Sequence, residues 1–433
     1  MSSIKVQQSN AWTIAVFAMI AVAPIISNIA TLIGAAMFLV WLFKYREFPI
    51  DYRSAVGRLS LVLIGYFFII LFVTLANEQS IRALQSLGAA SQFLYLALLL
   101  PFLATKMRGI SFSTIGYLTT SVTLVVFVLA VVEYQFLLNF DSGFVIETTE
   151  RIRSKWIGLY PGPRVALLTG NPNTLATILF PLAFLSIVGW QYKSLVWRVL
   201  AVIAMISGLI TTGILAETRI TIVAAPILSV TVWFYLFHVE RSFAYFLAAL
   251  FLMIVLVAAF RWDVVSEFTW VRRMMALLLE LSNDSEVFYD NSVAARWVMF
   301  KSTWYAFLDS PLIGHGAHNK YEAIRAYFQG TILQGSHYRT THNILVTHAA
   351  VGGLLAISSV LMVIMLPLYN VWKAKGGLRQ IDSILIALIL STSLITLGMS
   401  ETMFFNDAKN TFYIILFFLA AQLTDCKQPK LVS

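Results

Sequence analysis

The sequence predicts an all-α membrane protein that crosses the bilayer many times, and two observations carry this prediction. Of the 433 residues, 59% are hydrophobic and 12% are charged, whereas a soluble domain is usually about half apolar and about a quarter charged. The apolar residues also form runs along the whole chain, too many for a signal peptide followed by a globular domain. A helix that crosses a membrane needs about 20 apolar residues, so we expect about 12 transmembrane helices.

These runs divide the chain into three parts. Residues 1–260 hold the first nine predicted spans, residues 261–342 form a long polar segment, and residues 343–433 hold the last three spans and a tail. The expected spans are roughly 11–27, 29–43, 59–76, 87–104, 115–138, 166–190, 198–216, 220–238, 243–260, 343–370, 383–399 and 411–424.

The distribution of Lys and Arg predicts the orientation. The net charge is +9, and the excess falls in alternate loops such as 44–58 and 371–379, while the other loops are balanced. Cytoplasmic loops carry such an excess. We therefore expect both termini in the cytoplasm and segment 261–342 on the outer face. The net positive charge is therefore explained by the basic cytoplasmic loops. No nucleic-acid partner is expected.

The outer segment 261–342 is predicted to be helical. Residues 267–281 have an amphipathic pattern typical of a helix on a membrane surface. Asn291 is a suitable cap for a second helix that ends near Asp309, and a third short helix is expected over 319–328.

Arg219 is the first candidate binding residue. It lies in a loop of almost no length between two apolar runs, so its side chain must lie at the membrane boundary. A guanidinium at this place suits a phosphate or diphosphate ester, which it can bind with two hydrogen bonds. The alternative is an anchor that reaches the lipid headgroups or pairs with Glu217.

Arg296 is the second candidate, on the predicted helix that begins at 291. Its neighbours Trp297, Phe300 and Trp304 recur at helical spacing, and we expect that face to pack on the membrane domain. The alternative is an exposed arginine on an amphipathic helix.

His342 directly precedes the tenth predicted span. A histidine titrates near neutral pH and is a natural general base for removing a proton from a hydroxyl. Asn343 is placed to orient the ring or the substrate, although a histidine that hydrogen-bonds to the backbone at a helix entrance is the ordinary alternative. Further candidates nearby are His337, Tyr338, Arg339 and His348.

The stretch 161–174 interrupts the start of the sixth predicted span with Gly, Pro and Asn residues, and it contains Arg164 and Asn173. Irregular backbone at membrane depth persists only where it is buried in protein or lines a cavity. This stretch is expected to shape a groove for a lipid-linked substrate, or else to be a bent helix entrance.

No metal or cofactor is expected from the sequence. The single cysteine, Cys426, excludes a cysteine-rich metal site. His342 and His348 are six residues apart with no acid between them, which does not match zinc-ligand spacing on one helix face.

Taken together, these motifs resemble the O-antigen ligase family of the wider O-antigen ligase/polymerase superfamily. The resemblance rests on Gly-Asn-Pro-Asn at 170–173, Thr218-Arg219, Arg296-Trp297, Asp309 to Gly316, and His342-Asn343 with Gly352-Gly353 downstream. The motifs lie in order along residues 160–355, on the face predicted to be outside.

The resemblance implies a GT-C-like glycosyltransferase of the bacterial inner membrane that acts in lipopolysaccharide biosynthesis. Its members transfer a polysaccharide from undecaprenyl diphosphate to a hydroxyl of the lipid A–core on the periplasmic face. By resemblance, Arg219 and Arg296 hold the diphosphate and His342 is the base for an inverting, metal-independent displacement. The chain departs from the family at Glu217-Thr218, where relatives often have Ser before the arginine.

Three alternative functions remain open at this point. An O-antigen polymerase and a protein O-oligosaccharyltransferase use the same donor, and the size of segment 261–342 favours the ligase. A solute transporter would need facing charges in the membrane and internal repeats. Glu133 is nearly the only acidic residue within a predicted span, and no repeat is visible.

Overall fold

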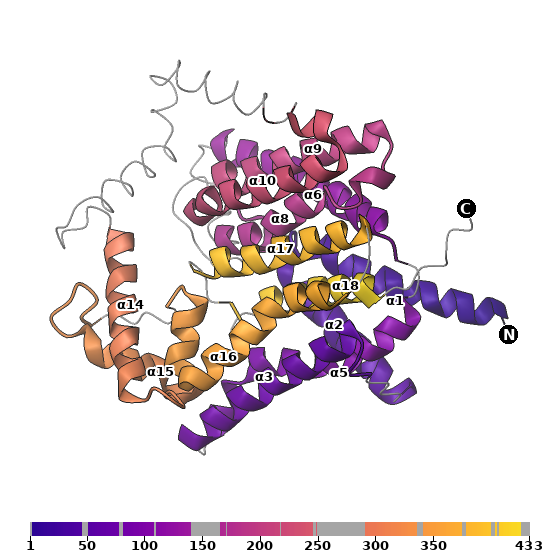
Figure 1. The fold of residues 1–433 in the computed structure, drawn as a ribbon. Coiled ribbons are helices and arrows are strands. Elements are labelled where there is room, and N and C mark those ends of the chain that lie inside the picture. The colour runs from indigo at the N-terminus through magenta and orange to yellow at the C-terminus, as the bar shows by residue number, and fades with distance from the viewer. Residues whose placement is uncertain are drawn as a thin grey trace.

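The fold is all-helical, as predicted. The computed structural model describes residues 2–45, 51–77, 81–107, 110–139, 165–169, 171–216, 218–245, 248, 291–335, 341–374, 378–399, 403–404 and 407–425. Within these ranges every regular element is a helix (Figure 1). The amphipathic segment predicted at 267–281 and most of the ninth predicted span lie outside the described residues.

Most of the α-helices follow the apolar runs of the sequence, whereas α15 is short and polar. The α-helices have the following bounds. They are α1 (Ser2–Val22), α2 (Ser27–Lys44), α3 (Ala55–Asn77), α5 (Gly88–Lys106), α6 (Phe112–Asn139), α8 (Pro172–Leu185), α9 (Leu195–Leu209), α10 (Arg219–Val239), α14 (Asn291–Asp309), α15 (Gly316–Arg325), α16 (Ile344–Lys373), α17 (Leu378–Gly398) and α18 (Asp407–Asp425), with short α4 (Ile81–Gln85). Among the described residues, seven helical segments are long and apolar enough to cross a membrane, and three shorter helices are also apolar. The protein is therefore a multi-pass membrane protein, and the count of 12 stays a prediction.

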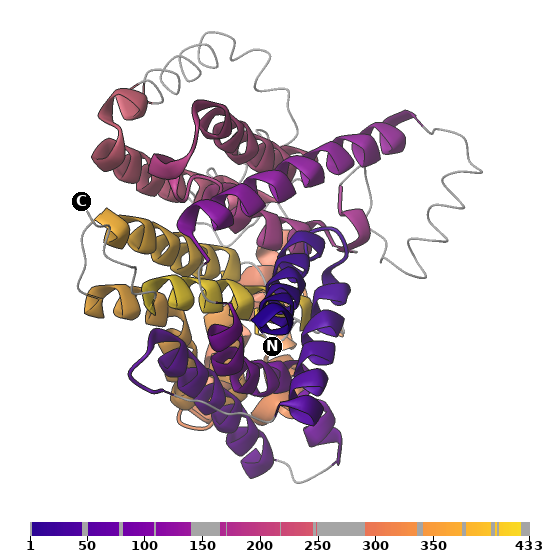
Figure 2. The ribbon, with the colours of Figure 1, turned by 90° about the vertical axis from the view of Figure 1, so that its right-hand side faces the viewer.

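Helices α17 and α18 lie in the middle of the molecule. Figures 1 and 2 show them between α6, α8, α9 and α10 on one side and α3 and α5 on the other. Side chains all around α18 are buried, among them Phe412, Tyr413 and Phe418. A helix that is apolar on every face is stable only in such a central position. By contrast, α2 and α3 expose Phe43 and Phe72, as expected of helices that face lipid.

Hydrogen bonds between helices define two opposite ends of the bundle. At one end Asp425, the last residue of α18, accepts from the backbone nitrogens of Ala55 (2.7 Å) and Val56 (3.1 Å) at the start of α3. At the other end the Thr74 hydroxyl, near the end of α3, accepts from the backbone nitrogen of Ala317 in α15 (3.1 Å). We call these the Asp382 end and the His342 end, after the residues described below. This grouping of segments agrees with the alternation of loops predicted from the charges.

At the Asp382 end, one carboxylate joins three segments. Asp382 of α17 accepts from the Tyr235 hydroxyl of α10 (2.5 Å), the Gly189 backbone nitrogen (3.1 Å) and the Gln191 side-chain nitrogen (3.4 Å). Because Tyr235 belongs to α10 whereas Gly189 and Gln191 belong to the turn after α8, Asp382 fixes the positions of α10 and α17 relative to that turn.

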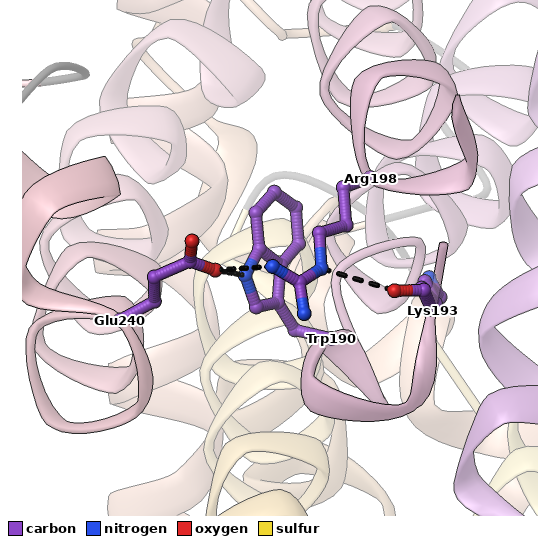
Figure 3. A network of polar contacts seen from close by, with 4 residues as sticks. All are labelled: Trp190, Lys193, Arg198 and Glu240. Atoms are coloured by element: carbon purple, nitrogen blue, oxygen red, sulfur yellow. Dashed lines mark hydrogen bonds and ion pairs between the residues drawn. The ribbon is translucent and has the colours of Figure 1, made fainter. Parts of the chain in front are cut away.

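A second network at the same end contains an ion pair. Arg198 of α9 contacts Glu240 at 2.7 Å and donates to the Lys193 carbonyl at 3.1 Å, and the Trp190 ring nitrogen donates to Glu240 at 2.6 Å (Figure 3). Burial lowers the pKa of the Lys193 amine to about 7, an effect opposed by the charge of Asp382. Its amine donates to the Ser186 carbonyl.

Candidate functional site

The chain just before Arg219 forms a π-helix, Ile210–Leu215, which continues α9. The Ala216 nitrogen donates to the Thr211 carbonyl (2.8 Å) and the Thr218 nitrogen to the Thr212 carbonyl (3.1 Å). Arg219 is the first residue of α10, so its backbone lies at the turn between two apolar helices, as predicted. Short π-helical segments are rare and occur frequently at functional sites. Nothing in the apolar run Ile-Thr-Thr-Gly-Ile-Leu indicates this segment in advance.

The stretch that includes Val165 to Thr174 packs beside this π-helix. The Val165 nitrogen donates to the Leu215 carbonyl (2.9 Å), and the Leu167 nitrogen donates to the Glu133 carboxylate (2.8 Å). Asn171 caps α8 by accepting from the Asn173 nitrogen (2.8 Å). The predicted irregular backbone is therefore present and is held by α6 and the π-helix. Arg164 lies outside the described residues, and Asn173 is half-buried in the first turn of α8.

His342 has an unusual backbone conformation at the entrance of α16. Its φ angle is +49°, a left-handed conformation that is uncommon for residues other than glycine. Such strain costs roughly 1–3 kcal/mol and is found preferentially at functional sites. The ring is half-buried. The strain at His342 therefore supports a functional role for this residue, independently of the sequence motif.

Asn343 fixes the start of α16. Its side-chain oxygen accepts from the Val346 nitrogen (3.0 Å), which caps the helix, and its amide nitrogen lies 3.5 Å from the Met399 carbonyl. Thr347 donates to the Asn343 carbonyl at 2.6 Å and also shares a hydrogen bond with Thr341. Both polar atoms of the Asn343 side chain are thus engaged with the backbone, at the start of α16 and at Met399.

Helix α16 breaks one third of the way along, at Gly352 and Gly353. Gly353 has φ +56° and ψ −143°, outside the helical range. The turn after α14 fills the break, because the Leu354 nitrogen donates to the Pro311 carbonyl (2.8 Å) and the His315 nitrogen to the Ala350 carbonyl (2.8 Å). The break separates the first turns of α16, which follow His342, from the longer part of the helix after Gly353.

Arg296 lies on α14, which packs against α15 and α16, and it is half-buried. The prediction that Trp297, Phe300 and Trp304 pack on the membrane domain is wrong, because they are 44%, 43% and 53% exposed. The buried side chains among the described ones of α14 are Ala295, Met299, Ser302, Thr303, Ala306 and Phe307. These mostly small side chains let α14 approach its neighbours closely, whereas the aromatic face does not.

The structure groups the candidate residues in two sets. His342 and Asn343 directly precede α16, and Arg296 lies on α14, which packs against α16. Arg219 begins α10, which packs on α17 and α8. The placement of the Arg219 side chain, and of His337, Tyr338 and Arg339, lies outside the described part of the chain. The roles of all these residues remain predictions.

The sequence does not indicate that His348 and Lys320, near the His342 end, are buried. His348 is fully buried, with one ring nitrogen 2.8 Å from the Tyr66 hydroxyl and the other 2.6 Å from the Ile344 carbonyl. Both nitrogens are engaged, so His348 is a structural residue. Lys320 of α15 is 6% exposed, and burial lowers its pKa to about 8. Its place in a polar, amphipathic helix gives no sign of this burial.

Among the described residues no three His, Cys, Asp or Glu side chains gather as a metal site.

Comparison with known proteins identifies the segment that contains these features. The family model described as O-antigen ligase matches residues 204–361, from α9 to the middle of α16. No curated protein matches the chain. The match includes Arg219, Arg296 and His342 together with the π-helix and the break in α16. Residues 204–361 are therefore similar to the O-antigen ligase family, in agreement with the resemblance of the motifs.

Proposed function

We propose that this protein is an O-antigen ligase. It transfers a polysaccharide from undecaprenyl diphosphate to a hydroxyl of the lipid A–core, on the periplasmic face of the bacterial inner membrane. The observation that carries the proposal is that one family segment, 204–361, contains all three residues proposed for binding and catalysis. We expect a GT-C-like arrangement of about 12 spans, as the apolar runs predict.

The proposed reaction is a single displacement at the anomeric carbon. The His342 imidazole takes the proton from the acceptor hydroxyl, and that oxygen forms a bond to the anomeric carbon. The bond between this carbon and the diphosphate oxygen breaks, and its electron pair leaves with undecaprenyl diphosphate. The proton remains on His342, and the configuration at the carbon is inverted. General base catalysis of this kind contributes typically about 10²–10⁴ in rate.

Arg219 and Arg296 are proposed to bind the diphosphate. Negative charge grows on the leaving group as the glycosidic bond breaks, and preorganised cationic donors stabilise it. A guanidinium offers two parallel hydrogen bonds to a phosphate oxygen pair. The loss of one such donor costs about 10²–10³ in rate. This arrangement requires no metal or cofactor.

The backbone features of the His342 end are proposed to position the His342 and Arg219 side chains. Asn343 caps α16 and so fixes the residue before it, His342. The π-helix sets the place where α10 begins, and therefore the place of Arg219. Segment 261–342 is proposed to form the outer wall of the site, with room for two large substrates.

The first experiment identifies the product. The purified protein is incubated with undecaprenyl-diphosphate glycan and lipid A–core, with and without EDTA. Glycan on lipid A–core in both conditions supports the proposal. Longer lipid-linked glycan alone would show an O-antigen polymerase, and glycan on an added Ser- or Thr-containing peptide would show a protein O-oligosaccharyltransferase. Loss of ligation with EDTA, restored by added divalent cation, would contradict the metal-independent mechanism.

A further inference from the structure

Between Trp297 and Leu308, α14 exposes a row of apolar side chains. Trp297, Phe300, Trp304 and Leu308 recur at intervals of three or four residues, and each is more than two fifths exposed. The Trp297 and Phe300 rings are stacked, with centroids 5.9 Å apart. We call these four residues the α14 apolar face. Single exposed apolar residues are ordinary, but a continuous row of this kind marks an interaction surface.

The direction of α14 makes a membrane surface the natural partner. Figure 1 shows α14 at a steep angle to α16 and α17, across the end of the bundle. If α16 and α17 cross the membrane, α14 runs along its surface. Tryptophan is enriched at that depth because its ring is apolar and its N–H is polar.

The α14 apolar face is also continuous with apolar side chains that face lipid. Leu308 is followed by Leu312, which is exposed in the turn that fills the break in α16. The Leu312 carbonyl accepts from the Leu355 nitrogen, and from there α16 exposes Leu354, Leu355 and Met362. Exposed apolar side chains thus occur on the span of α16, on this turn and on α14.

The charges of α14 fit an anionic surface. Lys301 is exposed beside the aromatic row, with its amine 5.5 Å from the Trp297 ring centroid. The helix has one acidic residue, Asp309 at its C-terminal end, and this carboxylate accepts from the Tyr327 hydroxyl. An amphipathic helix with aromatic residues on one side and lysine next to them is typical of binding to anionic lipid headgroups.

We propose that the α14 apolar face is inserted into the interface of a bilayer that contains anionic phospholipid. The partner is the lipid surface itself, independent of the glycan substrates, so the proposal does not rest on the ligase function. By analogy with other interfacial helices, the ring of Phe300 would lie about 5–10 Å deep, at the boundary of headgroups and acyl chains.

A fluorescent probe on α14 tests this contact in the full-length protein. Phe300→Cys is made in a Cys426→Ser background, labelled with an environment-sensitive dye and reconstituted into vesicles of phosphatidylcholine and phosphatidylglycerol. Lipids carry a spin label near the headgroup end or near the methyl end of the acyl chain. Glu322→Cys, exposed on α15, is the aqueous control, and Phe72→Cys, exposed on the apolar α3, is the lipid-facing control.

We expect a blue-shifted dye at position 300 that is quenched by spin-labelled lipid, more strongly by the shallow label than by the deep one. Position 322 should show neither effect, and position 72 should be quenched. Trp304→Cys is the second probe, in case the first variant does not fold. If positions 300 and 304 behave like position 322, the proposal is wrong. A blue shift without quenching by lipid would also overturn it, because another protein surface would then cover α14.

Discussion

The two ends of the helical bundle use polar groups in opposite ways. At the Asp382 end, charged side chains bind each other and the backbone, as in the contacts of Asp382 and the pair Arg198–Glu240. At the His342 end, the chain departs from regular geometry instead. It has a π-helix before Arg219, a left-handed residue at His342 and a broken helix at Gly353.

This difference separates stability from function. Paired buried groups hold helices together, and leaving one of them unpaired is costly. Strained backbone, by contrast, lowers stability and persists where it positions a side chain that has a task. We therefore expect substitutions at the Asp382 end to change mainly the stability of the protein, and substitutions at the His342 end to change mainly its activity.

Apart from His342→Ala, which is considered last, the largest expected effect is the loss of activity in Arg219→Ala. Loss of one cationic donor to the leaving group should lower the transfer rate by about 10²–10³, with little change in melting temperature. The matched control is Arg241→Ala at the Asp382 end, an exposed arginine over the Phe237 ring. Equal transfer rates for the two variants, measured with the same substrates, would contradict the comparison between the ends.

The next largest expected effect is a loss of stability in Asp382→Ala. Tyr235, Gly189 and Gln191 lose their acceptor, and each unsatisfied buried group costs about 1–3 kcal/mol. The melting temperature in detergent should fall clearly, while the transfer rate per folded molecule stays near that of the wild type. The exposed Asp51→Ala serves as control. A folded Asp382→Ala protein without activity would show that this end takes part in the reaction.

Gly353→Ala should disturb the His342 end through its backbone. A Cβ atom at this residue would lie 2.4 Å from the Pro311 carbonyl oxygen, and φ is +56°. The strain costs roughly 1–3 kcal/mol, and we expect both the melting temperature and the transfer rate to fall. Gly65→Ala, where a Cβ meets nothing within 4 Å, should leave both unchanged. If Gly353→Ala and Gly65→Ala have the same melting temperature and the same transfer rate, the break in α16 has no positioning role.

The smallest effect is on the pH dependence of stability, through Lys320. Its folded-state pKa is about 8, below the usual 10.5, so the folded protein binds fewer protons than the unfolded chain between these values. Stability should therefore rise with pH from about 8 to 10.5. Lys320→Met should remove this rise and raise the melting temperature at neutral pH. Melting curves against pH test this, with the exposed Lys301→Met as control. Parallel curves for wild type and Lys320→Met would contradict it.

The sequence predicts the all-helical, multi-pass character of the chain because runs of apolar residues indicate burial in lipid or protein. It also predicts that Arg219 lies at a turn and that His342 lies at a helix entrance, since both positions follow from where the apolar runs begin. The π-helix is hidden because Ile210–Leu215 is as apolar as a regular helix. The burial of Lys320 depends on how α15 docks onto α3 and α16, and local pattern contains no information on that docking.

The aromatic residues of α14 illustrate a different limit of prediction from sequence. Periodicity shows correctly that Trp297, Phe300 and Trp304 share a face, but it does not show what covers that face. The close contacts of α14 are made instead by small residues such as Ala295 and Ala306, which give a weak hydrophobic signal. Helix packing in membranes favours small residues for this reason.

The central claim is that the strained His342 is the general base, and one pair of variants tests it most directly. His342→Ala and His318→Ala are compared for transfer of glycan to lipid A–core, His318 being exposed on α15 near the same end. We predict that His342→Ala loses about 10²–10⁴ in rate at an unchanged or higher melting temperature, while His318→Ala keeps its activity. A folded His342→Ala protein with the transfer rate of the wild type would contradict the account.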